Sequence, residues 1–178
     1  MQSKQEMWER AAAFHGHVCG GLTIGFQAAR YAMELLEIDF SKDEDVVCVT
    51  ENDACGVDAI QVLLGCSVGK GNLLFRLRGK QAFSFFNRKS GKSVRLVLRP
   101  GPDMPREARQ QYLFNADYKD LFDVKPVPFA LPERARLFAS QPCAVCGETT
   151  AEQWLHAQEG QLVCPDCFKA YSLSLIHI

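Results

Sequence analysis

The sequence predicts an α+β domain followed by a small cysteine-rich module, within a chain of 178 residues. Three observations predict this arrangement. Apolar residues recur at helical spacing in the first third of the chain, β-branched and aromatic runs occupy the middle, and two C-x-x-C pairs lie near the end. We therefore expect one packed core and one appendage that is too small to fold without a metal ion.

Four segments have the spacing or the boundary signals of helices. The strongest pattern places Leu22, Phe26 and Met33 on one face of a helix that we expect to be central and packed. Another segment follows the helix-start signal Glu51-Asn52-Asp53, and the last has proline in its first turn. The expected helices are residues 6–14, 21–36, 54–64 and 105–115.

Short β-branched and aromatic runs predict the strands. Residues 46–50 are apolar throughout apart from a final threonine, which indicates a buried strand. The runs that follow are rich in lysine and arginine, and we expect these basic side chains to line the solvent face of an antiparallel meander. The three expected strands of the meander are residues 73–78, 81–86 and 94–98.

A stretch with three prolines within seven positions, from Pro126 to Pro132, predicts an extended connector between domains. We expect an α+β domain over residues 1–124, a linker over 125–140 and a zinc finger over 141–172. The last residues, 173–178, resemble the translation of a sequencing adapter, so we expect a non-native tail there.

Charge and hydropathy argue against nucleic-acid and membrane partners. The net charge is −1, although residues 1–66 hold four basic and eleven acidic side chains while residues 67–110 hold eleven basic and two acidic ones. Neither a membrane-spanning run nor the apolar core of a signal peptide is present, so we expect a cytoplasmic protein. In a reducing compartment, eight cysteines indicate metal or redox chemistry more than disulfides.

The richest chemistry lies in the stretch His15-Gly16-His17-Val18-Cys19-Gly20-Gly21. If this stretch is extended, the two imidazoles and the thiol point to one side. A thiol beside the N-terminus of the following helix also tends to ionise, and the thiolate is the form that binds metal. We expect His17 and Cys19 to be metal ligands. The alternative is that Cys19 is a small buried apolar residue and the histidines are ordinary loop residues.

The other N-terminal cysteines are candidates for a further ligand. Cys55 and Cys66 flank the helix expected at 54–64 and lie about 16 Å apart along its axis, so they cannot share one ion. We choose Cys55, because the helix dipole favours a thiolate in the first turn. Cys48 lies within an apolar strand and is most simply a core residue.

A site with few protein ligands leaves a coordination position open for water or substrate. We therefore assign His15, Asp58 and Lys70 as candidate catalytic residues, with Glu51 or Asp58 orienting a ligand or acting as a base. Such carboxylates also serve as helix caps, and Lys70 also fits a solvated sheet face. The glycine-rich turn around Lys70 departs from the phosphate-loop pattern at the magnesium-binding position, which Gly71 occupies.

The four C-terminal cysteines have the spacing of a structural zinc site. Each C-x-x-C turn directs two thiolates at one ion, and seventeen residues separate the two pairs. A hairpin around Ala157–Gly160 and a helix from the last cysteine would make a treble-clef zinc finger. The finger is acidic, which favours a structural or protein-contact role over nucleic-acid binding. The expected zinc ligands are Cys143, Cys146, Cys164 and Cys167.

Together these residues resemble the family of the formylmethanofuran dehydrogenase E subunit. The resemblance rests on the stretch from Phe14 to Leu22, on Cys55-Gly56-Val57-Asp58 and on the glycine-rich turn ending at Leu73. It implies a thioredoxin-like mixed sheet flanked by helices, a metal site on the histidine–cysteine motif and a C-terminal treble-clef finger. It also implies an association with molybdenum or tungsten formylmethanofuran dehydrogenase, as found in anaerobic one-carbon metabolism.

We therefore expect an accessory subunit or small metalloprotein. It would carry structural Zn²⁺ in the finger and Zn²⁺ or another divalent metal at the N-terminal site. Its partner would be a formylmethanofuran dehydrogenase-like or other molybdenum or tungsten enzyme complex, and an exposed strand would allow a homodimer. The alternative is a metal-delivery or thiol-redox protein that uses the same histidine–cysteine cluster.

Overall fold

The computed structural model describes residues 2–170. The chain forms two compact units, the first ending at Ala135 and the second beginning at Arg136. The tail expected at residues 173–178 lies outside the described residues. Within the described part, no helix is both long enough and apolar enough to cross a membrane.

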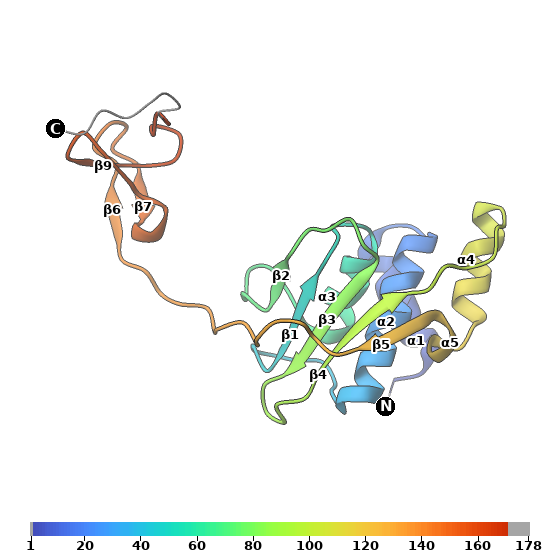
Figure 1. Ribbon diagram of the computed structural model, residues 1–178. Coiled ribbons are helices and arrows are strands. Elements are labelled where there is room, and N and C mark those ends of the chain that lie inside the picture. Colours follow the sequence, from blue (N-terminus) through green and yellow to red (C-terminus); the bar gives the residue numbers. More distant parts are fainter. Residues whose placement is uncertain (1, 171–178) are drawn as a thin grey trace. The chain divides into compact units, whose positions relative to one another are not determined.

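The first unit is built on a mixed sheet whose strands lie in the order β2-β1-β3-β4-β5 (Figure 1). β2 runs parallel to β1, and every other neighbouring pair is antiparallel. The strands are β1 (Val46–Thr50), β2 (Leu73–Phe75), β3 (Ala82–Asn87), β4 (Ser93–Leu98) and β5 (Phe122–Lys125).

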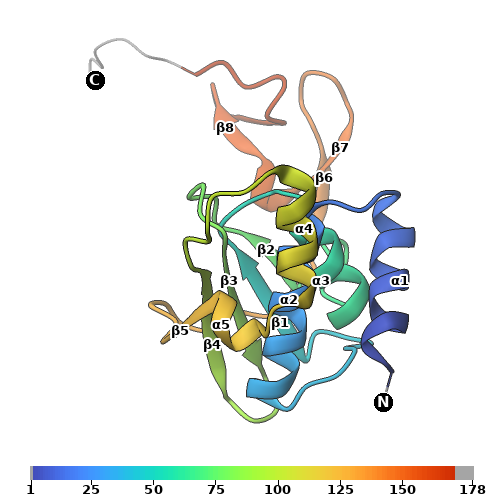
Figure 2. The ribbon, with the colours of Figure 1, turned by 90° about the vertical axis from the view of Figure 1, so that its right-hand side faces the viewer.

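Helices cover one face of this sheet, as Figures 1 and 2 show. The central helix α2 is buried along most of its length, as its apolar spacing predicts. The fully buried amide of Gln27 donates to the carbonyl oxygens of Leu113 and Ala116, at 2.7 and 3.0 Å, and so fixes the end of α4 on α2. The helices are α1 (Lys4–His15), α2 (Gly20–Leu36), α3 (Gly56–Leu64), α4 (Arg106–Asn115) and the short α5 (Tyr118–Leu121).

Strand alternation divides the apolar residues of β1 between two clusters. Val46 and Cys48 belong to the main core beneath the helices, whereas Val47 and Val49 face the other side of the sheet together with Phe86. On that second face the chain after β5 runs back across the strands, and its residue Phe129 packs against Phe86 with ring centroids 5.9 Å apart (Figure 1). Both faces of the sheet are therefore covered.

The expected antiparallel meander of three strands is only partly correct. β3 and β4 pair as expected, but β2 pairs with β1 and lies two strands away from β3. Because α3 connects β1 to β2, the pair forms a β-α-β crossover, whose strands run parallel. Gly79 and Lys80 therefore join two strands that are not neighbours. Neither α5 nor β5 was expected.

The basic side chains of these strands were expected to face solvent, and that of Arg95 on β4 does not. Its guanidinium donates to both carboxylate oxygens of Glu51, at 2.6 and 2.9 Å, and both side chains are largely buried. The hydrogen bonds from Arg95 hold the pKa of Glu51 below its usual value. Glu51 is thus committed to an ion pair within the sheet and does not serve the histidine–cysteine stretch.

The second unit consists of two small hairpins. The hairpin expected around Ala157–Gly160 forms, with Glu159 and Gly160 in its turn. The helix expected from Cys167 does not form in the described residues, which end at Ala170. The elements are β6 (Ser140–Pro142), β7 (Thr149–Ala151), the 3₁₀ turn η1 (Glu152–Trp154), β8 (His156–Gln158) and β9 (Gln161–Val163).

The buried ion pair gives a test of the sheet. Arg95→Ala leaves the Glu51 carboxylate buried without its partner, so at pH 7 we expect the free energy of unfolding to fall by about 3–5 kcal/mol. Because the pairing lowers the pKa of Glu51 in the folded state, its stabilisation is present above the usual carboxyl range and disappears as the pH falls through the lowered pKa. Urea unfolding at pH 7 and at acidic pH should therefore show a smaller difference between variant and wild type in acid.

The matched control is Lys92→Ala, which removes an exposed ion pair with Glu37. Its cost should stay below about 1 kcal/mol at either pH. Equal losses in the two variants would contradict the assignment of Arg95 and Glu51 as a buried, structurally important pair.

Candidate metal centre

Two groups of donor side chains gather in the described part of the chain, one in each unit. In the first unit, one ligand atom each from His15, His17 and Cys19 lies within 4.8 Å of the others. In the second unit the same holds for the sulfurs of Cys143, Cys146, Cys164 and Cys167. The first group offers nitrogen and sulfur donors and the second offers sulfur donors alone, and both sets suit zinc and similar divalent metals.

The N-terminal group forms where one helix ends and the next begins. His15 is the last residue of α1, Gly16 turns the chain in a left-handed conformation with φ of 85°, and Cys19 caps the N-terminus of α2. The Cys19 sulfur accepts a hydrogen bond from the Leu22 amide at 3.3 Å. The expected extended stretch is thus wrong at His15, which is helical, but the expected convergence of the three side chains is present.

Asp58, from the first turn of α3, orients His15. Its carboxylate lies 2.7 Å from Nδ1 of the imidazole, and Nε2 lies 3.9 Å from the Cys19 sulfur. The His15 side chain is only 11% exposed, whereas His17 is exposed, and the two rings lie with centroids 4.3 Å apart. A carboxylate on one imidazole nitrogen and a metal on the other is a common arrangement in proteins. The geometry therefore favours His15 as a ligand, beside His17 and Cys19.

The donor distances fit a metal site. With zinc about 2.0–2.1 Å from nitrogen and about 2.3 Å from sulfur, tetrahedral geometry places the two donors about 3.6 Å apart. The 3.9 Å separation of His15 Nε2 and Cys19 Sγ needs only a small inward movement to match it. Three such donors leave room for a fourth ligand.

Cys55 lies beside this group but outside the set within 4.8 Å. It occupies the N-cap position of α3 and lies close to the thiol of Cys19. Burial raises the pKa of Cys55, and the neighbouring Cys19 raises it further. A raised pKa disfavours the thiolate form of Cys55, which the helix dipole was expected to favour. A metal ion shared with Cys19 would reverse this preference, since a coordinating thiol is deprotonated.

Glycines allow α2 and α3 to approach closely enough to bring Cys55 and Asp58 to the site. A Cβ atom at Gly25 would lie 1.9 Å from the carbonyl oxygen of Gly56, so only glycine fits at this crossing. A Cβ atom at Gly21 would lie 3.2 Å from the Cβ of Cys55. The packing role of Gly25 was not predicted from the sequence, although a glycine within a strongly apolar helix is a signal of close packing.

Two other residues that were considered for the site, Lys70 and Cys66, lie away from the histidine–cysteine group. Lys70 donates to the carbonyl oxygen of Ser41 at 2.9 Å, and the Ser41 amide in turn bonds to Leu64 at the far end of α3. Since α3 is about 13 Å long, Lys70 is not brought to Asp58 or His15. Cys66 is fully buried, donates to the carbonyl oxygen of Val46 and lies outside the N-terminal donor group.

The C-terminal group is closed around a single centre. The sulfurs of Cys146 and Cys164 lie 3.9 Å apart, close to the roughly 3.8 Å that tetrahedral zinc–sulfur bonds of about 2.3 Å require. The Cys164 amide donates to the Cys143 sulfur at 3.3 Å. The backbone amides of Cys146, Cys164 and Val145 near this sulfur lower its pKa to about 6. Turns that direct amides at a thiolate are suited to holding a metal-bound sulfur.

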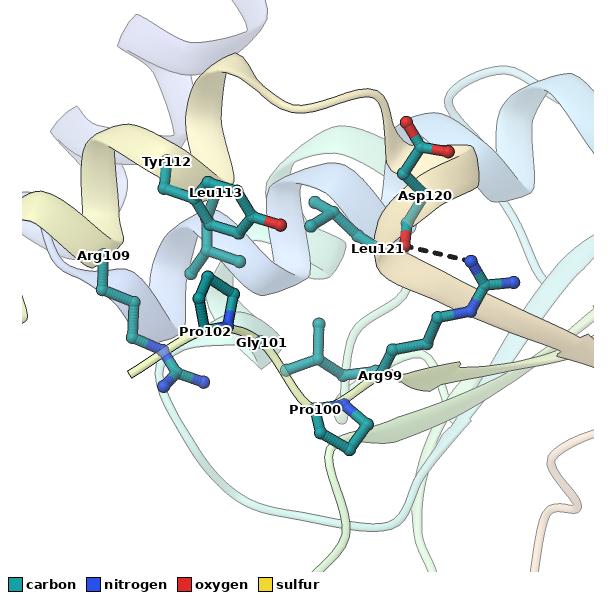
Figure 3. A pocket seen from close by; sticks show the side chains of 10 residues that line it. Arg99, Pro100, Gly101, Pro102, Arg109, Tyr112, Leu113, Asp120 and Leu121 are labelled. Carbon is teal, nitrogen blue, oxygen red and sulfur yellow. Dashed lines mark hydrogen bonds between the residues drawn. The ribbon is translucent and has the colours of Figure 1, made fainter. Parts of the chain in front are cut away.

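The hollows of the first unit lie away from these donors. One, of about 30 Å³, is bounded by α4, by the chain after β4 and by α5, and there Arg99 donates to the Asp120 carbonyl oxygen at 3.1 Å (Figure 3). A second, of about 920 Å³, lies against α1 and the C-terminal half of α2 and includes Met7, Met33 and Tyr118. Neither is lined by a histidine or a cysteine. The nitrogen and sulfur donors of the first unit therefore gather at the helix junction and not in either of these hollows.

The fold and the two donor groups define a two-unit α+β protein with a candidate metal centre in each unit. The profile of the FmdE family, described as "FmdE, Molybdenum formylmethanofuran dehydrogenase operon", matches residues 14–121. The chain belongs to this family, as the resemblance in its sequence indicated. Residues 135–169 match a second profile, described as a domain of unknown function (DUF7573), which includes all four C-terminal cysteines.

Two known proteins show the extent of the likeness. The crystal structure of a Syntrophus aciditrophicus protein, described as like FmdE, the E subunit of tungsten formylmethanofuran dehydrogenase, superposes with a TM-score of 0.70 at 23% identity, covering 93% of this chain and 92% of that one. A protein of Archaeoglobus fulgidus named "Probable S-adenosyl-L-methionine-binding protein" is 28% identical over 78% of this chain. The match spans 47% of the length of that relative. The first likeness shows the shared fold.

The glycine crossing can be tested by adding one methyl group. Gly25→Ala places a Cβ atom within the Gly56 carbonyl group, so α2 and α3 must separate. We expect unfolding to become easier by about 2–3 kcal/mol and metal binding at the histidine–cysteine group to weaken as Asp58 moves away. Thermal unfolding and metal titration measure the two effects.

Gly20→Ala, on the same helix, is the control. Its added Cβ atom would contact only Leu113 at an ordinary 3.8 Å, so stability and metal binding should stay close to wild type. A Gly25→Ala protein with unchanged stability would show that the close crossing is not required.

Proposed function

We propose that this chain is a metal-binding protein with a functional centre in its first unit and a structural zinc site in its second. The N-terminal centre would hold Zn²⁺ or another divalent metal on His15, His17 and Cys19, with Cys55 the nearest further thiol. The observation that carries the proposal is the orientation of the His15 imidazole. Its Nδ1 atom contacts the Asp58 carboxylate, and its Nε2 atom faces the Cys19 sulfur.

An open N-terminal centre and a closed C-terminal one suit different roles. When bound, a divalent metal supplies Lewis acidity and lowers the pKa of a coordinated water molecule. In this proposal Asp58 acts on His15 as a positioning residue, and the exposed His17 lies on the solvent side, where a substrate or an exchanging ligand has access. Four cysteines fill the second site, so it stabilises the small unit and has no position for substrate.

The wider role follows from family membership. We propose an accessory subunit or small metalloprotein of molybdenum- or tungsten-dependent one-carbon or redox metabolism in anaerobes, working with a formylmethanofuran dehydrogenase-like or similar enzyme complex. The family description and the Syntrophus aciditrophicus structure support this placement. The proposal includes a thioredoxin-like arrangement of the first unit, a treble-clef arrangement of the second, a homodimer and a cytoplasmic location.

A metal-delivery or thiol-redox protein is the second candidate. The thiol of Cys55 lies beside that of Cys19, and such a pair can pass a metal between ligands or react with an oxidant. A delivery protein would release the N-terminal metal rapidly to a chelator while the four-cysteine site keeps its own. A stably bound N-terminal metal would favour the first candidate.

Metal analysis of purified protein tests both sites. We expect two equivalents of metal per chain, and one equivalent after His15→Ala combined with Cys19→Ser. Cys146→Ser combined with Cys167→Ser should also leave one equivalent, held in the first unit. If the first double variant retains as much metal as wild type, the N-terminal centre does not exist.

Removal of the orienting carboxylate tests the geometry of His15. Asp58→Ala should keep the same metal stoichiometry at saturation but weaken N-terminal binding by about 10–100-fold, because the imidazole loses the partner that fixes its orientation. Competition with a chromogenic chelator measures the affinity. Asp53→Ala removes an exposed carboxylate near the start of the same helix and serves as the control. Equal effects of the two variants would indicate a general charge effect and contradict the positioning role.

A further inference from the structure

The segment that continues β2 is an exposed, basic edge of the sheet. Its sequence, FRLRGK over residues 75–80, holds three basic residues and no acidic one, and every residue of it is exposed. Phe75 is 47% exposed and Leu77 is 51% exposed. We call residues 75–80 the basic edge segment. Exposed apolar side chains on the outermost strand of a sheet are a hazard that proteins normally avoid unless a partner uses them.

Backbone hydrogen bonds join this segment to the rest of the sheet on one side. The amides of Arg76 and Arg78 donate to the carbonyl oxygens of Thr50 and Glu51, at 2.8 and 2.9 Å, so the contact with the end of β1 continues past the last residue of β2. Because backbone groups alternate along a strand, the amides of Phe75 and Leu77 between them point away from the sheet. Since β2 is the edge strand, they have no neighbouring strand in the described part of the chain. They can accept an added strand.

The side chains alternate as well. Continuing the alternation of β2 past Phe75 places Phe75 and Leu77 on one face of the segment, and Arg76 and Arg78 on the other. The Arg76 guanidinium stacks over the Phe129 ring at 4.7 Å, and that of Arg78 donates to the outward carbonyl of Leu77 at 2.8 Å. The nearby carboxylate of Glu51 already pairs with Arg95. The positive charge of this edge is therefore available to an acidic partner.

These features select one class of partner. An antiparallel second copy would set arginines of one chain opposite arginines of the other, and like charges on paired strands are destabilising. A nucleic acid would use the basic side chains but would leave the open amides and Leu77 unpaired. An extended peptide with carboxylates at every second position, and apolar residues between them, satisfies the amides, the arginines and the apolar side chains together.

We propose that the basic edge segment binds an extended, acidic segment of a partner protein, which adds to the sheet as a strand beside β2. Carboxylates of the partner pair with Arg76 and Arg78, and its apolar residues cover Phe75 and Leu77. The segment is hydrogen-bonded to Thr50 and Glu51, only a few residues before Cys55, so the partner docks near the end of β1 that leads to the N-terminal donor group. The proposal does not depend on metal being bound there.

Fluorescence anisotropy with synthetic peptides tests the proposal on the full chain. The probe is a labelled ten-residue peptide that alternates glutamate and valine, and its comparators are a lysine–valine alternating peptide and a peptide of the same composition with its glutamates grouped together. We expect binding of the alternating acidic peptide only. Leu77→Pro removes one outward amide and keeps the amides that pair with β1, so it should weaken binding at least about tenfold.

Charge reversal provides the second variant and its control. Arg76→Glu combined with Arg78→Glu should weaken binding of the acidic peptide at least about tenfold and create binding of the lysine–valine peptide. Lys89→Glu combined with Lys92→Glu changes the net charge equally at the turn between β3 and β4 and should leave binding unchanged. Circular dichroism establishes that each variant is folded. If Leu77→Pro does not fold, the test rests on the Arg76→Glu, Arg78→Glu variant, which should prefer the lysine–valine peptide to the acidic one.

Four results would overturn the proposal. They are equal binding by wild type and a folded Leu77→Pro protein, equal losses in the two charge-reversed variants, tighter binding of a single-stranded oligonucleotide than of the acidic peptide, and dimerisation of wild type that Leu77→Pro abolishes. The last result, seen by sedimentation, would assign the edge to a second copy of this chain.

Discussion

The close crossing of α2 and α3 at Gly25 and Gly56 is the constraint on which the first unit depends. With no side chain between them, the two helix backbones touch, and the N-termini of both helices come together beside the end of α1. Cys19, Cys55 and Asp58 all lie in or next to the first turns of these helices, and His15 ends α1. A larger residue at the crossing would separate groups that are far apart in sequence, so the donor geometry is a property of packing and not of the His15–Cys19 stretch alone.

The two donor groups are built in different ways. In the second unit, each pair of cysteines lies on one short turn, and backbone amides of the same turns surround the Cys143 sulfur. In the first unit, the orientation of His15 depends on a carboxylate 43 residues away on another helix. Within the second group, each pair of cysteines is therefore set by the conformation of its own turn, whereas the orientation of His15 in the first group depends on the position of α3 beside the end of α1. The difference is in keeping with the two roles proposed for these groups.

Local features of the sequence were predictable, and tertiary ones were not. The helix predicted from apolar periodicity differs from α2 by one residue at its start. The strand predicted from β-branched residues has the same bounds as β1. The convergence of His15, His17 and Cys19 was expected from an alternation that His15 does not follow, because His15 ends α1 and the left-handed turn at Gly16 brings its side chain to the other two. The parallel pairing of β2, the burial of Arg95 against Glu51 and the distant position of Lys70 depend on contacts between separate elements. No pattern within one segment encodes them.

The folding unit is longer than the region by which the family is recognised. It includes β5 and the segment after β5 that crosses the second face of the sheet. The family profile ends at residue 121, yet the next residue, Phe122, is 1% exposed in the main core and pairs with Leu98 on β4. Farther on, Phe129 covers the opposite face of the sheet against Phe86. A chain cut at the limit of sequence similarity would lose its last strand and the cover of one sheet face. The physical domain therefore extends at least through Phe129, and excision or recombination of this unit has to respect that boundary.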